Sequence, residues 1–545
     1  MAPSNSSHRI VIVGAGFGGL GFAIWLKRNW GLEDFIIIEK ASDIGGTWRD
    51  NTYPGCSSDV PIHWYSLSTD LKPDWAASYG YQPEIQNYML GLVSKYKLRS
   101  YCMFDTRVVS ADWDSSARVY HIVAEDTQTG SKKEITATIL ISATGILSEP
   151  CTPGLKDAHT FKGTTFHSAT WRNDVPLEGK RVAVIGNGCS ATQFVPLIAK
   201  DPSVTVTQFC RTPMWYMKRD KPPYSEATKW VFSHLPITMR LHRYMIAVRL
   251  DLNYAFMYFY GGIVGRLMKR AMTNYVKQTA PSEYHDLVIP SYPPGCKRLI
   301  IDTGYLSALH RPNLTLTGDG IEKFTETGII TQKGDHIPFD VIIYATGFTT
   351  NRFPYTIRGS SGQTMNEYWE SQGGPTAYLG STVPGFPNFF MIQGPNTTTG
   401  HASVIFTQEV QFDYALKLFE PIISGELTSL EPTQSATTAY NSHIQDRLST
   451  SVWSQCASWY RSGPDGKIHS SFPGPVIWYW WLLRRPQWGD YLTRRGDKTQ
   501  PVKHGVRALT WIIRLAAAVV LGAAGRAWLG SGVRSTSRRA FFVRA

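Results

Sequence analysis

Two copies of one pattern, a strand followed by a glycine-rich turn and a helix, constrain this chain more than any other feature. The first copy, RIVIVGAGFGGLGFAIWLKRN, begins at Arg9, and the second, KRVAVIGNGCSATQFVPLIAK, begins at Lys180. Their turns read G-x-G-x-x-G and G-x-G-x-x-A, in which the small residues permit a tight turn, a close approach of backbone to pyrophosphate and close helix packing. The chain is therefore predicted to be α/β, with two Rossmann-like dinucleotide-binding domains.

The residues after the next strand distinguish the two nucleotides. The first copy continues into DFIIIEK, which ends in Glu39 and Lys40, and an acid at this position accepts hydrogen bonds from a ribose. The second continues into SVTVTQFC, followed by Arg211 and Thr212. An acid would repel a 2′-phosphate whereas arginine pairs with it, although a plain exposed arginine at a strand end is the alternative. The difference favours FAD at the first site, with Gly14, Gly16, Phe17, Gly19, Glu39 and Lys40 as candidate contacts, and NADPH at the second, with Gly186, Gly188, Ser190, Arg211 and Thr212.

The segment between the two turns carries aromatic residues, a glycine and a histidine, whereas a plain linker would favour small polar residues and proline. It reads FKGTTFHSATW over residues 161–171, with Arg172 next. Together with two apolar strands that run into Ala-Thr-Gly at 143–145 and 345–347, it resembles the two-dinucleotide flavoproteins over most of residues 8–410. Within that superfamily the segment is similar to the F-x-G-x-x-x-H-x-x-x-W signature of the Baeyer–Villiger monooxygenases. Relatives that oxygenate nitrogen usually end the pattern in tyrosine or phenylalanine, and Arg172 stands where the family has proline or aspartate.

Three further segments resemble the same family. GGTWRDNTYPGCSSD spans 45–59, which implies that Gly46, Thr47 and Trp48 lie beside the flavin and that Asp59 is an acid of the active site. YPPGCKRLIIDTGY spans 292–305, which implies a 2′-phosphate contact for Lys297 and a catalytic role for Arg298. QGPNTTTGHASVIF spans 393–406, which implies that Gly394 and Asn396 approach the isoalloxazine. An ordinary turn aspartate, and a solvated basic face, are the alternatives for Asp59 and for the Lys297–Arg298 pair.

The resemblance implies that the cofactors carry out the redox chemistry and that the protein stabilises the charges that develop. NADPH reduces FAD, the reduced flavin captures molecular oxygen as a peroxide, and the peroxide attacks a carbonyl. Arg298 suits the developing negative charge because guanidinium stays protonated, and Asp59 would orient it. For His167, a role in coupling the two domains and a purely structural role are equally open. Trp171 lies in the same interdomain segment and is a candidate for the same coupling role.

The remaining residues predict the domain plan. The FAD-binding domain is expected at 1–150 and 351–480, the NADPH-binding domain at 151–222 and 291–350, and a helical insertion at 223–290. The apolar, aromatic insertion favours a bulky lipophilic carbonyl substrate, although ordinary helix packing explains its apolar residues equally well. Residues 481–545 are expected to form a basic tail, in which Leu509–Leu529 is long enough for a membrane-associated helix if Arg514 and Arg526 reach the interface.

Charge and cysteine content argue against two further classes of function, nucleic-acid binding and disulfide reduction. The net charge is +13, but residues 480–545 hold 13 Lys/Arg and 2 Asp/Glu, so the rest of the chain is nearly neutral. A basic tail on a neutral body fits a membrane surface rather than nucleic acid, which the body shows no groove pattern to bind. The 7 cysteines are scattered without a C-x-x-C pair, which argues against a disulfide framework, a zinc site and the redox dithiol of a disulfide reductase. Such spacing suits a reducing compartment, so a cytoplasmic protein is expected, with possible membrane association through the C-terminal segment.

The sequence therefore predicts a monooxygenase that uses FAD, NADPH and molecular oxygen to insert oxygen beside a ketone, giving an ester or lactone. The alternative is a flavin monooxygenase that oxygenates the nitrogen or sulfur of a small molecule. A relative that binds cofactors without turnover would keep the glycines and lose the acid and the arginine, and both Asp59 and Arg298 are present.

Overall fold

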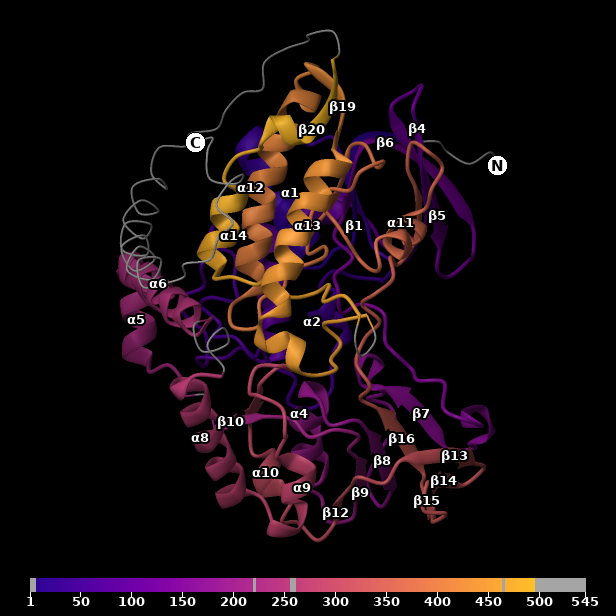
Figure 1. The fold of residues 1–545 in the computed structure, drawn as a ribbon, viewed down its shortest axis with the longest axis vertical. Helices are drawn as coiled ribbons and strands as arrows, with labels where there is room; N and C mark the ends of the chain where they lie inside the picture. Colours follow the sequence, from indigo (N-terminus) through magenta and orange to yellow (C-terminus); the bar gives the residue numbers. More distant parts are fainter. Residues whose placement is uncertain (1–5, 219–221, 255–260, 463–465, 496–545) are drawn as a thin grey trace. The chain divides into compact units, whose positions relative to one another are not determined.

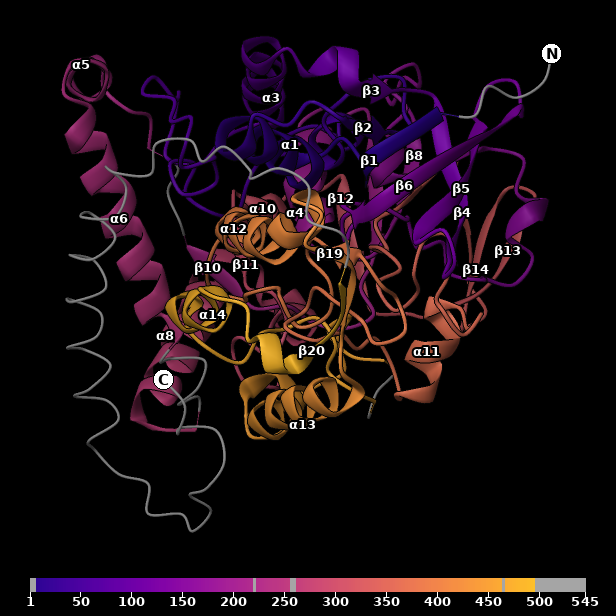
Figure 2. The same ribbon diagram turned by 90° about the horizontal axis from the view of Figure 1, so that it is seen from above.

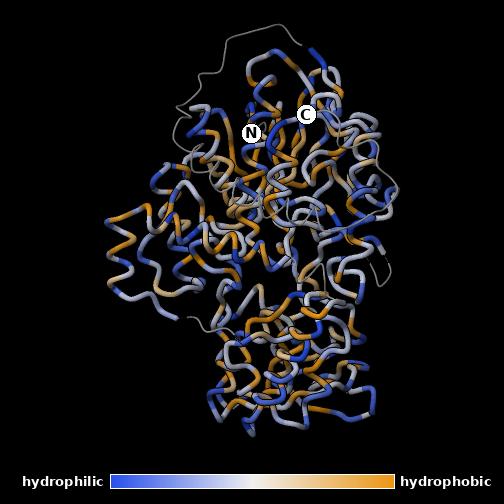
Figure 3. Tube along the Cα trace, turned by 60° about the vertical axis from the view of Figure 1, so that its left-hand side comes forward, coloured by the Kyte–Doolittle hydropathy of each residue, from blue (hydrophilic) through white to orange (hydrophobic). Residues whose placement is uncertain are grey.

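The computed structural model describes residues 6–218, 222–254, 261–462 and 466–495, which belong to one compact unit (Figure 1). Two separate sheets organise this unit, and each contains one of the glycine turns. Figure 3 shows hydrophobic stretches running through the interior of the fold, as expected for parallel strands that are covered on both faces.

The first sheet surrounds the first turn. Its strand order is β17-β4-β5-β6-β1-β2-β3, with β18 also paired to β6. The pairs β1–β2, β2–β3, β1–β6, β6–β18 and β4–β17 are parallel. Strand β5 is antiparallel to both of its neighbours, β4 and β6. The bounds are β1 (Ser6–Val13), β2 (Phe35–Ile38), β3 (Cys102–Met103), β4 (Thr106–Asp114), β5 (Val119–Asp126), β6 (Lys132–Ser142), β17 (Thr356–Arg358) and β18 (Phe389–Met391). Helices α1 (Phe17–Trp30) and α12 (Val404–Ile423) pack on each other, so the late part of the chain packs on the half of the fold that is expected to bind FAD.

The second sheet is wholly parallel, with the order β12-β9-β8-β16-β7. Its strands are β7 (Thr164–His167), β8 (Arg181–Ile185), β9 (Thr205–Phe209), β12 (Leu314–Thr317) and β16 (Val341–Tyr344). All five lie within 151–222 and 291–350, the two segments expected to form the NADPH-binding domain. Smaller elements surround it: α4 (Cys189–Ile198), α9 (His285–Val288), α10 (Tyr305–Ala308), β10 (Tyr216–Lys218), β11 (Ile300–Asp302), β13 (Ile321–Thr325), β14 (Gly328–Thr331) and β15 (His336–Pro338).

The two glycine turns are closed in the same way. Gly14 has φ +106°, and a Cβ there would lie 2.6 Å from the carbonyl oxygen of Ala143. Gly186 has φ +112°, and a Cβ there would lie 2.5 Å from the carbonyl oxygen of Ala345. Each Ala-Thr-Gly segment thus leaves its strand directly over a glycine turn, which explains why the two motifs occur twice together in the sequence.

Three helices, α5 (Glu226–His234), α6 (Pro236–Leu252) and α8 (Ile263–Thr279), form the predicted insertion at the edge of the fold (Figures 1 and 2). The other helices are α2 (Thr47–Asp50), α3 (Gln82–Tyr96), α11 (Met365–Ser371), α13 (Gln434–Ser449) and α14 (Val476–Leu483). Among the described residues, no helix is both long and apolar enough to cross a membrane.

The predicted tail begins later than the sequence indicated. Strand β20 (Tyr491–Arg495) pairs antiparallel with β19 (Leu427–Pro432), and the hydroxyl of the buried Tyr491 lies 2.7 Å from that of Tyr414. Residues 481–495 therefore belong to the folded body, because β20 pairs with β19 and Tyr491 is buried. The expected helix at 509–529 lies outside the described residues.

Candidate functional site

Bare backbone forms a cradle at the first glycine turn. A Cβ on Gly46 would lie 3.1 Å from Cα of Gly16, and a Cβ on Gly19 would lie 1.9 Å from the carbonyl oxygen of Gly14. The backbone N–H of Gly45 donates to the carbonyl of Ala15 at 3.0 Å, which holds the 45–48 loop over the turn. Side chains would fill this space, so the local geometry fits a pyrophosphate that lies directly against backbone.

The acid after the first turn is buried and holds the turn in shape. Glu39 accepts hydrogen bonds from the backbone N–H groups of Ala15 (2.7 Å) and Ala41 (2.9 Å). Burial raises the pKa of Glu39, although these two bonds oppose the shift. Lys40 is exposed and its Nζ lies 2.7 Å from Oε1 of Glu149. Phe17 and Thr47 are the first residues of α1 and α2, where the helix N-termini face the same turn region.

A cationic cluster forms beyond the second glycine turn. Lys297 donates to Oγ1 of Thr212 at 3.0 Å. Burial lowers the pKa of Lys297, and the nearby charge of Arg211 lowers it further. No carboxylate within the described ranges forms an ion pair with Lys297 or Arg211. Two adjacent cations without a counter-charge fit a phosphate, which agrees with the 2′-phosphate predicted there.

Gly188 and Ser190 lie at the N-terminus of α4, as the sequence predicted. No heavy atom lies within 4 Å of the position where a Cβ on Gly188 would stand. The open backbone leaves room for a phosphate at this helix N-terminus.

Asp59 and Arg298 form a tight ion pair between segments 239 residues apart. Nε and Nη2 of Arg298 lie 2.7 and 2.6 Å from the same carboxylate oxygen, Oδ2 of Asp59. Nη1 donates to the carbonyl of Gly400 at 3.3 Å. Burial acts to lower the pKa of Arg298, but the Asp59 carboxylate outweighs it, so the pKa lies above its usual value and the charge is permanent. Both side chains stay partly open, at 23% and 33% exposed for Arg298 and Asp59.

Two tyrosine hydroxyls lie within electrostatic range of this ion pair. Burial is the main cause that raises the pKa of Tyr65 and of Tyr460, and the charges of Asp59 and Arg298 act on both. The hydroxyl of Tyr65 accepts a hydrogen bond from Nε1 of Trp48 at 3.2 Å, which links the ion pair to the flavin-side loop. Sequence reasoning missed both tyrosines because neither stands inside a matched motif.

Gln193 joins the two halves and was also missed. Its Oε1 accepts hydrogen bonds from the hydroxyl of Tyr53 and the backbone N–H of Ser57, each at 3.2 Å, and its Nε2 donates to the carbonyl of Ser57 at 3.2 Å. Helix α4 of the second sheet is thereby attached to the 45–59 loop. A glutamine four residues into a helix carries no signal in sequence that would single it out.

His167 and Trp171 lie where the two halves meet. His167 ends β7 opposite Tyr344 of β16, and its Nδ1 accepts a hydrogen bond from the backbone of Ala169 at 3.0 Å. Burial lowers its pKa, which favours a neutral ring. The Trp171 ring lies 5.1 Å from that of Phe194, which lies 5.9 Å from that of Tyr53, so a chain of aromatic contacts connects the linker, α4 and the 45–59 loop.

The segment 393–406, predicted to approach the flavin, is held in place by contacts within the protein. A Cβ on Gly394 would lie 2.5 Å from the carbonyl oxygen of Gly380. Nδ2 of Asn396 donates to the carbonyls of Ile468 and Ser471, both at 2.9 Å. Both amide protons of Asn396 are therefore used within the protein, which leaves Gly394 as the more open of the two predicted flavin contacts.

One disulfide corrects the prediction from cysteine spacing. Cys296 and Cys456 are bonded, at a sequence separation of 160. The spacing argument considered only neighbours in sequence, whereas the return of the chain brings these two thiols together. The bond lies next to Lys297 and Arg298, and it removes the support that scattered cysteines lent to a cytoplasmic location.

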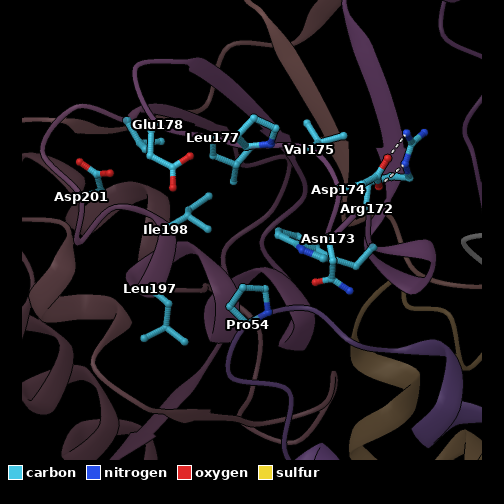
Figure 4. Close-up of a pocket in the computed structure, with 13 residues that line it drawn as sticks. Pro54, Arg172, Asn173, Asp174, Val175, Leu177, Glu178, Leu197, Ile198 and Asp201 are labelled. Atoms are coloured by element: carbon cyan, nitrogen blue, oxygen red, sulfur yellow. Dashed lines mark hydrogen bonds and ion pairs between the residues drawn. The ribbon is translucent and has the colours of Figure 1, made fainter.

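Two cavities lie apart from the Asp59–Arg298 pair. One of about 490 Å³ is lined by Pro54, by residues 171–178 and by the C-terminal end of α4, with the Arg172–Asp174 ion pair at its edge (Figure 4). Arg172, the departure from the family pattern, thus faces the surface. The other, of about 70 Å³, lies between the 142–149 and 391–398 segments and includes Gly394. In the described part of the chain, no three His, Cys, Asp or Glu side chains gather as metal ligands.

Comparisons with known proteins agree with this geometry. Residues 8–241 match the family model of pyridine nucleotide-disulphide oxidoreductases. A Baeyer-Villiger monooxygenase of Streptomyces coelicolor is 35% identical over 501 residues, 90% of this chain and 94% of that protein. One of Pseudomonas aeruginosa is 36% identical over 489 residues, 89% of this chain and 91% of that protein. The solved structure of cyclohexanone monooxygenase from Rhodococcus sp. Phi1 bound to NADP+ is similar with a TM-score of 0.79 and 25% identity, covering 90% of this chain and 100% of that one.

Proposed function

The chain belongs to the Baeyer–Villiger monooxygenases, and on that premise we propose that the Asp59–Arg298 pair is the centre at which it oxygenates a lipophilic ketone. The enzyme uses FAD and NADPH, which supply reducing equivalents and the activation of molecular oxygen when they are bound. The single observation that carries the proposal is the half-buried, permanently charged Arg298, whose guanidinium is held by the Asp59 carboxylate.

Arg298 would stabilise negative charge that develops on the oxygen atoms of the reaction. Its charge persists at every working pH because Asp59 holds the pKa above its usual value. Asp59 uses one oxygen, Oδ2, for both hydrogen bonds, which fixes the orientation of the guanidinium. The Gly400 carbonyl accepts from Nη1 and restrains the same group from the other side. A preorganised charge of this kind needs no reorientation during the reaction.

The two turns would hold the cofactors on either side of this charge. The Gly14–Gly19 cradle with Glu39 and Gly46 fits FAD, and Gly186, Gly188 and the Arg211–Lys297 cluster fit NADPH. His167 and Trp171 would couple the two halves, since they join β7, α4 and the 45–59 loop. Gln193 strengthens the same joint.

The substrate proposed is a bulky lipophilic carbonyl compound. Helix α6 packs against Val60, Trp64 and Ala402, an apolar cluster next to Asp59 and Gly400. An apolar wall at this position favours a substrate with an apolar body and one polar group. We also propose that the basic segment after residue 495 associates with a membrane surface, on the evidence of its sequence.

The experiment is a product analysis with purified holoenzyme, NADPH and air. Linear, cyclic and steroidal ketones would be compared with thioethers and tertiary amines of similar size. Ester or lactone formation at the higher kcat/KM supports the proposal. Sulfoxide or N-oxide formation with no ester would instead support heteroatom oxygenation, the second candidate, and would overturn ketone oxidation as the main activity.

A further inference from the structure

Helices α5 and α6 expose an unusual amount of apolar surface. Of the 18 large hydrophobic side chains that are exposed in the described residues, 9 fall within 226–279. Six of them form what we call the outer stripe, with exposures from 52% to 63%: Trp230, Leu235, Ile237, Leu241, Met245 and Leu252. Scattered exposed hydrophobics are ordinary, but a contiguous group of this size marks a contact surface.

The outer stripe is ordered by the helical repeat. Ile237, Leu241, Met245 and Leu252 recur at intervals of four, four and seven residues, which places them on one face of α6. The opposite face carries Met239, Arg243 and Leu250, which are buried. Figures 1 and 2 both draw α5 and α6 at the edge of the described fold. Helix α6 is therefore apolar on both faces, although, among the described residues, only those of its inner face are buried.

The inner face of α6 packs firmly on the rest of the protein, so the exposure of the outer stripe does not result from a poorly packed helix. Arg243 donates to the carbonyl of Ser66 at 2.9 Å, and its guanidinium carbon lies 4.6 Å from the centre of the Trp64 ring. Leu250 packs in the cluster of Val60 and Trp64. This fixed inner side holds the stripe outward as a rigid surface.

Positive charge borders the stripe. Arg240 and Arg249 lie on its two edges, given about 3.6 residues per helical turn. The carboxylates of residues 226–279 are Glu226, which pairs with Lys229 at 2.8 Å, and Asp251, which is buried beside His401 at 3.1 Å. Helix α8 repeats the combination, with Ile263 and Leu267 exposed next to Arg266 and Arg270. No carboxylate of this segment is therefore free to neutralise the arginines at the edges.

We propose that the outer stripe docks on an anionic lipid bilayer, with its apolar side chains in the interface and the flanking arginines on the lipid headgroups. A helix with apolar residues on its outward face and bases at the edges fits this occupant. A second copy of the chain would bring arginines against arginines, which opposes self-association. Sequence supplies a second membrane signal, because residues 480–545 carry a net charge of +11 from 13 basic and 2 acidic residues.

Docking would place the candidate site one helix away from the bilayer. The inner face of α6 contacts Val60, the residue after Asp59. A lipophilic ketone dissolved in the membrane would then be close to the Asp59–Arg298 pair. This consequence rests on the proposed function, whereas the docking itself does not.

The test is vesicle flotation of the full-length holoenzyme without turnover, so its outcome does not depend on substrate. Vesicles of phosphatidylcholine alone are compared with vesicles that also contain phosphatidylserine. The wild type should float with the anionic vesicles and less so at high salt. The Leu241→Glu/Met245→Glu variant should lose about tenfold or more in partitioning, because charged side chains replace apolar ones in the interface.

Controls separate the stripe from other causes. Leu90→Glu on α3, also exposed, should bind vesicles as the wild type does. FAD content and NADPH-dependent reduction should be unchanged in every variant, and Ile237→Ser/Leu252→Ser serves as a second, neutral pair if the first fails to fold. Arg240→Glu/Arg249→Glu should weaken mainly the salt-sensitive part of binding.

Three results would overturn the proposal. The first is a wild type that ignores anionic vesicles. The second is a Leu241→Glu/Met245→Glu variant that binds as the wild type does, since the segment after residue 495 would then carry all the binding. The third is a wild-type dimer in solution that this variant dissociates, since the stripe would then be an interface between copies.

Discussion

At the scale of single residues, Arg298 combines partial burial with a charge that its partner Asp59 maintains. Its side chain is 23% exposed, yet Asp59 keeps it protonated and oriented. The charges of this pair also act on the buried hydroxyls of Tyr65 and Tyr460. A charge held in this way acts on developing negative charge more strongly than one in water.

Replacing Arg298 by alanine should separate reduction from oxygenation. The Arg298→Ala variant should still be reduced by NADPH, while ester formation should fall by about 10²- to 10³-fold because the stabilising charge is lost. Anaerobic flavin bleaching and product yield measure the two steps. Arg358→Ala, which removes an exposed arginine 3.1 Å from Asp112, is the matched control and should change neither. Full ester formation in Arg298→Ala would contradict its role.

The Arg211–Lys297 cluster should select NADPH over NADH. Arg211→Ala should raise the Michaelis constant for NADPH about ten- to hundredfold, as expected for a charged hydrogen bond, and leave that for NADH nearly unchanged. Steady-state kinetics with both nucleotides measure this. Arg172→Ala, an exposed arginine paired with Asp174 at 2.6 Å, should affect neither nucleotide. An equal change for both nucleotides in Arg211→Ala would show that Arg211 does not contact the 2′-phosphate.

The lowered pKa of Lys297 predicts a pH dependence. Burial and the charge of Arg211 favour the neutral amine, so the ammonium form that binds phosphate is lost as pH rises through the lowered pKa. The affinity for NADP+ should therefore fall on the alkaline side, and in Arg211→Ala the fall should move to higher pH. Binding titrations across pH measure this, with NAD+ as the control. A parallel fall for NAD+ would exclude Lys297 as the cause.

At the scale of elements, the strand–turn–helix units depend on glycines that no other residue could replace. Gly14 combines a positive φ with a backbone oxygen 2.6 Å from where a Cβ would stand. The turn brings β1 and α1 under the Ala143 segment, and the second sheet repeats the arrangement with Gly186 and Ala345. The element pattern is therefore determined locally.

Two glycine substitutions should act in opposite directions. Gly14→Ala should lower the free energy of unfolding by about 1–3 kcal/mol and reduce the FAD content, because both φ and space are unsuitable. Gly91→Ala on α3, where nothing lies within 4 Å, should raise it by about 0.5–1 kcal/mol through higher helix propensity. Denaturant unfolding and flavin absorbance of the purified proteins measure both effects. Equal stability of the two variants would disprove the steric argument.

At the scale of the whole molecule, the late part of the chain returns to complete the site. Gly400, Tyr460 and Cys456 all reach the segment around Arg298 from residues beyond 390. The disulfide at Cys296 ties this return directly to the loop that carries Lys297 and Arg298.

Loss of that disulfide should weaken the closure of the fold. Cys456→Ser should cost about 2–4 kcal/mol of unfolding free energy, because the closed loop of about 160 residues is released. Thermal unfolding with and without reductant measures this, and peptide mapping without reduction should recover the Cys296–Cys456 pair. Cys151→Ser, at a free and half-buried cysteine, is the control. Equal stability of Cys456→Ser and the control would contradict the prediction.

Sequence reasoning succeeded where the chemistry is local. The fold class, the two nucleotides and the family were all predicted from short motifs and are confirmed, and the structure brings Asp59 to Arg298 and Arg211 to Lys297. It failed for the disulfide and missed Tyr65, Tyr460 and Gln193, which act through contacts between distant segments. The roles of the individual site residues stay predictions until the variants are measured.

The sequence by itself determined the two glycine turns, because a positive φ and a Cβ-free approach are demands that one residue type meets. It also predicted FAD for the first nucleotide site and NADPH for the second, from Glu39 and Arg211, and the roles of these two residues stay predictions. Only the tertiary structure decided that Arg298 pairs with Asp59, that Cys296 bonds to Cys456 and that one apolar face of α6 stays exposed among the described residues. These three features depend on contacts between segments that are distant in sequence, and residue spacing along the chain does not predict such contacts.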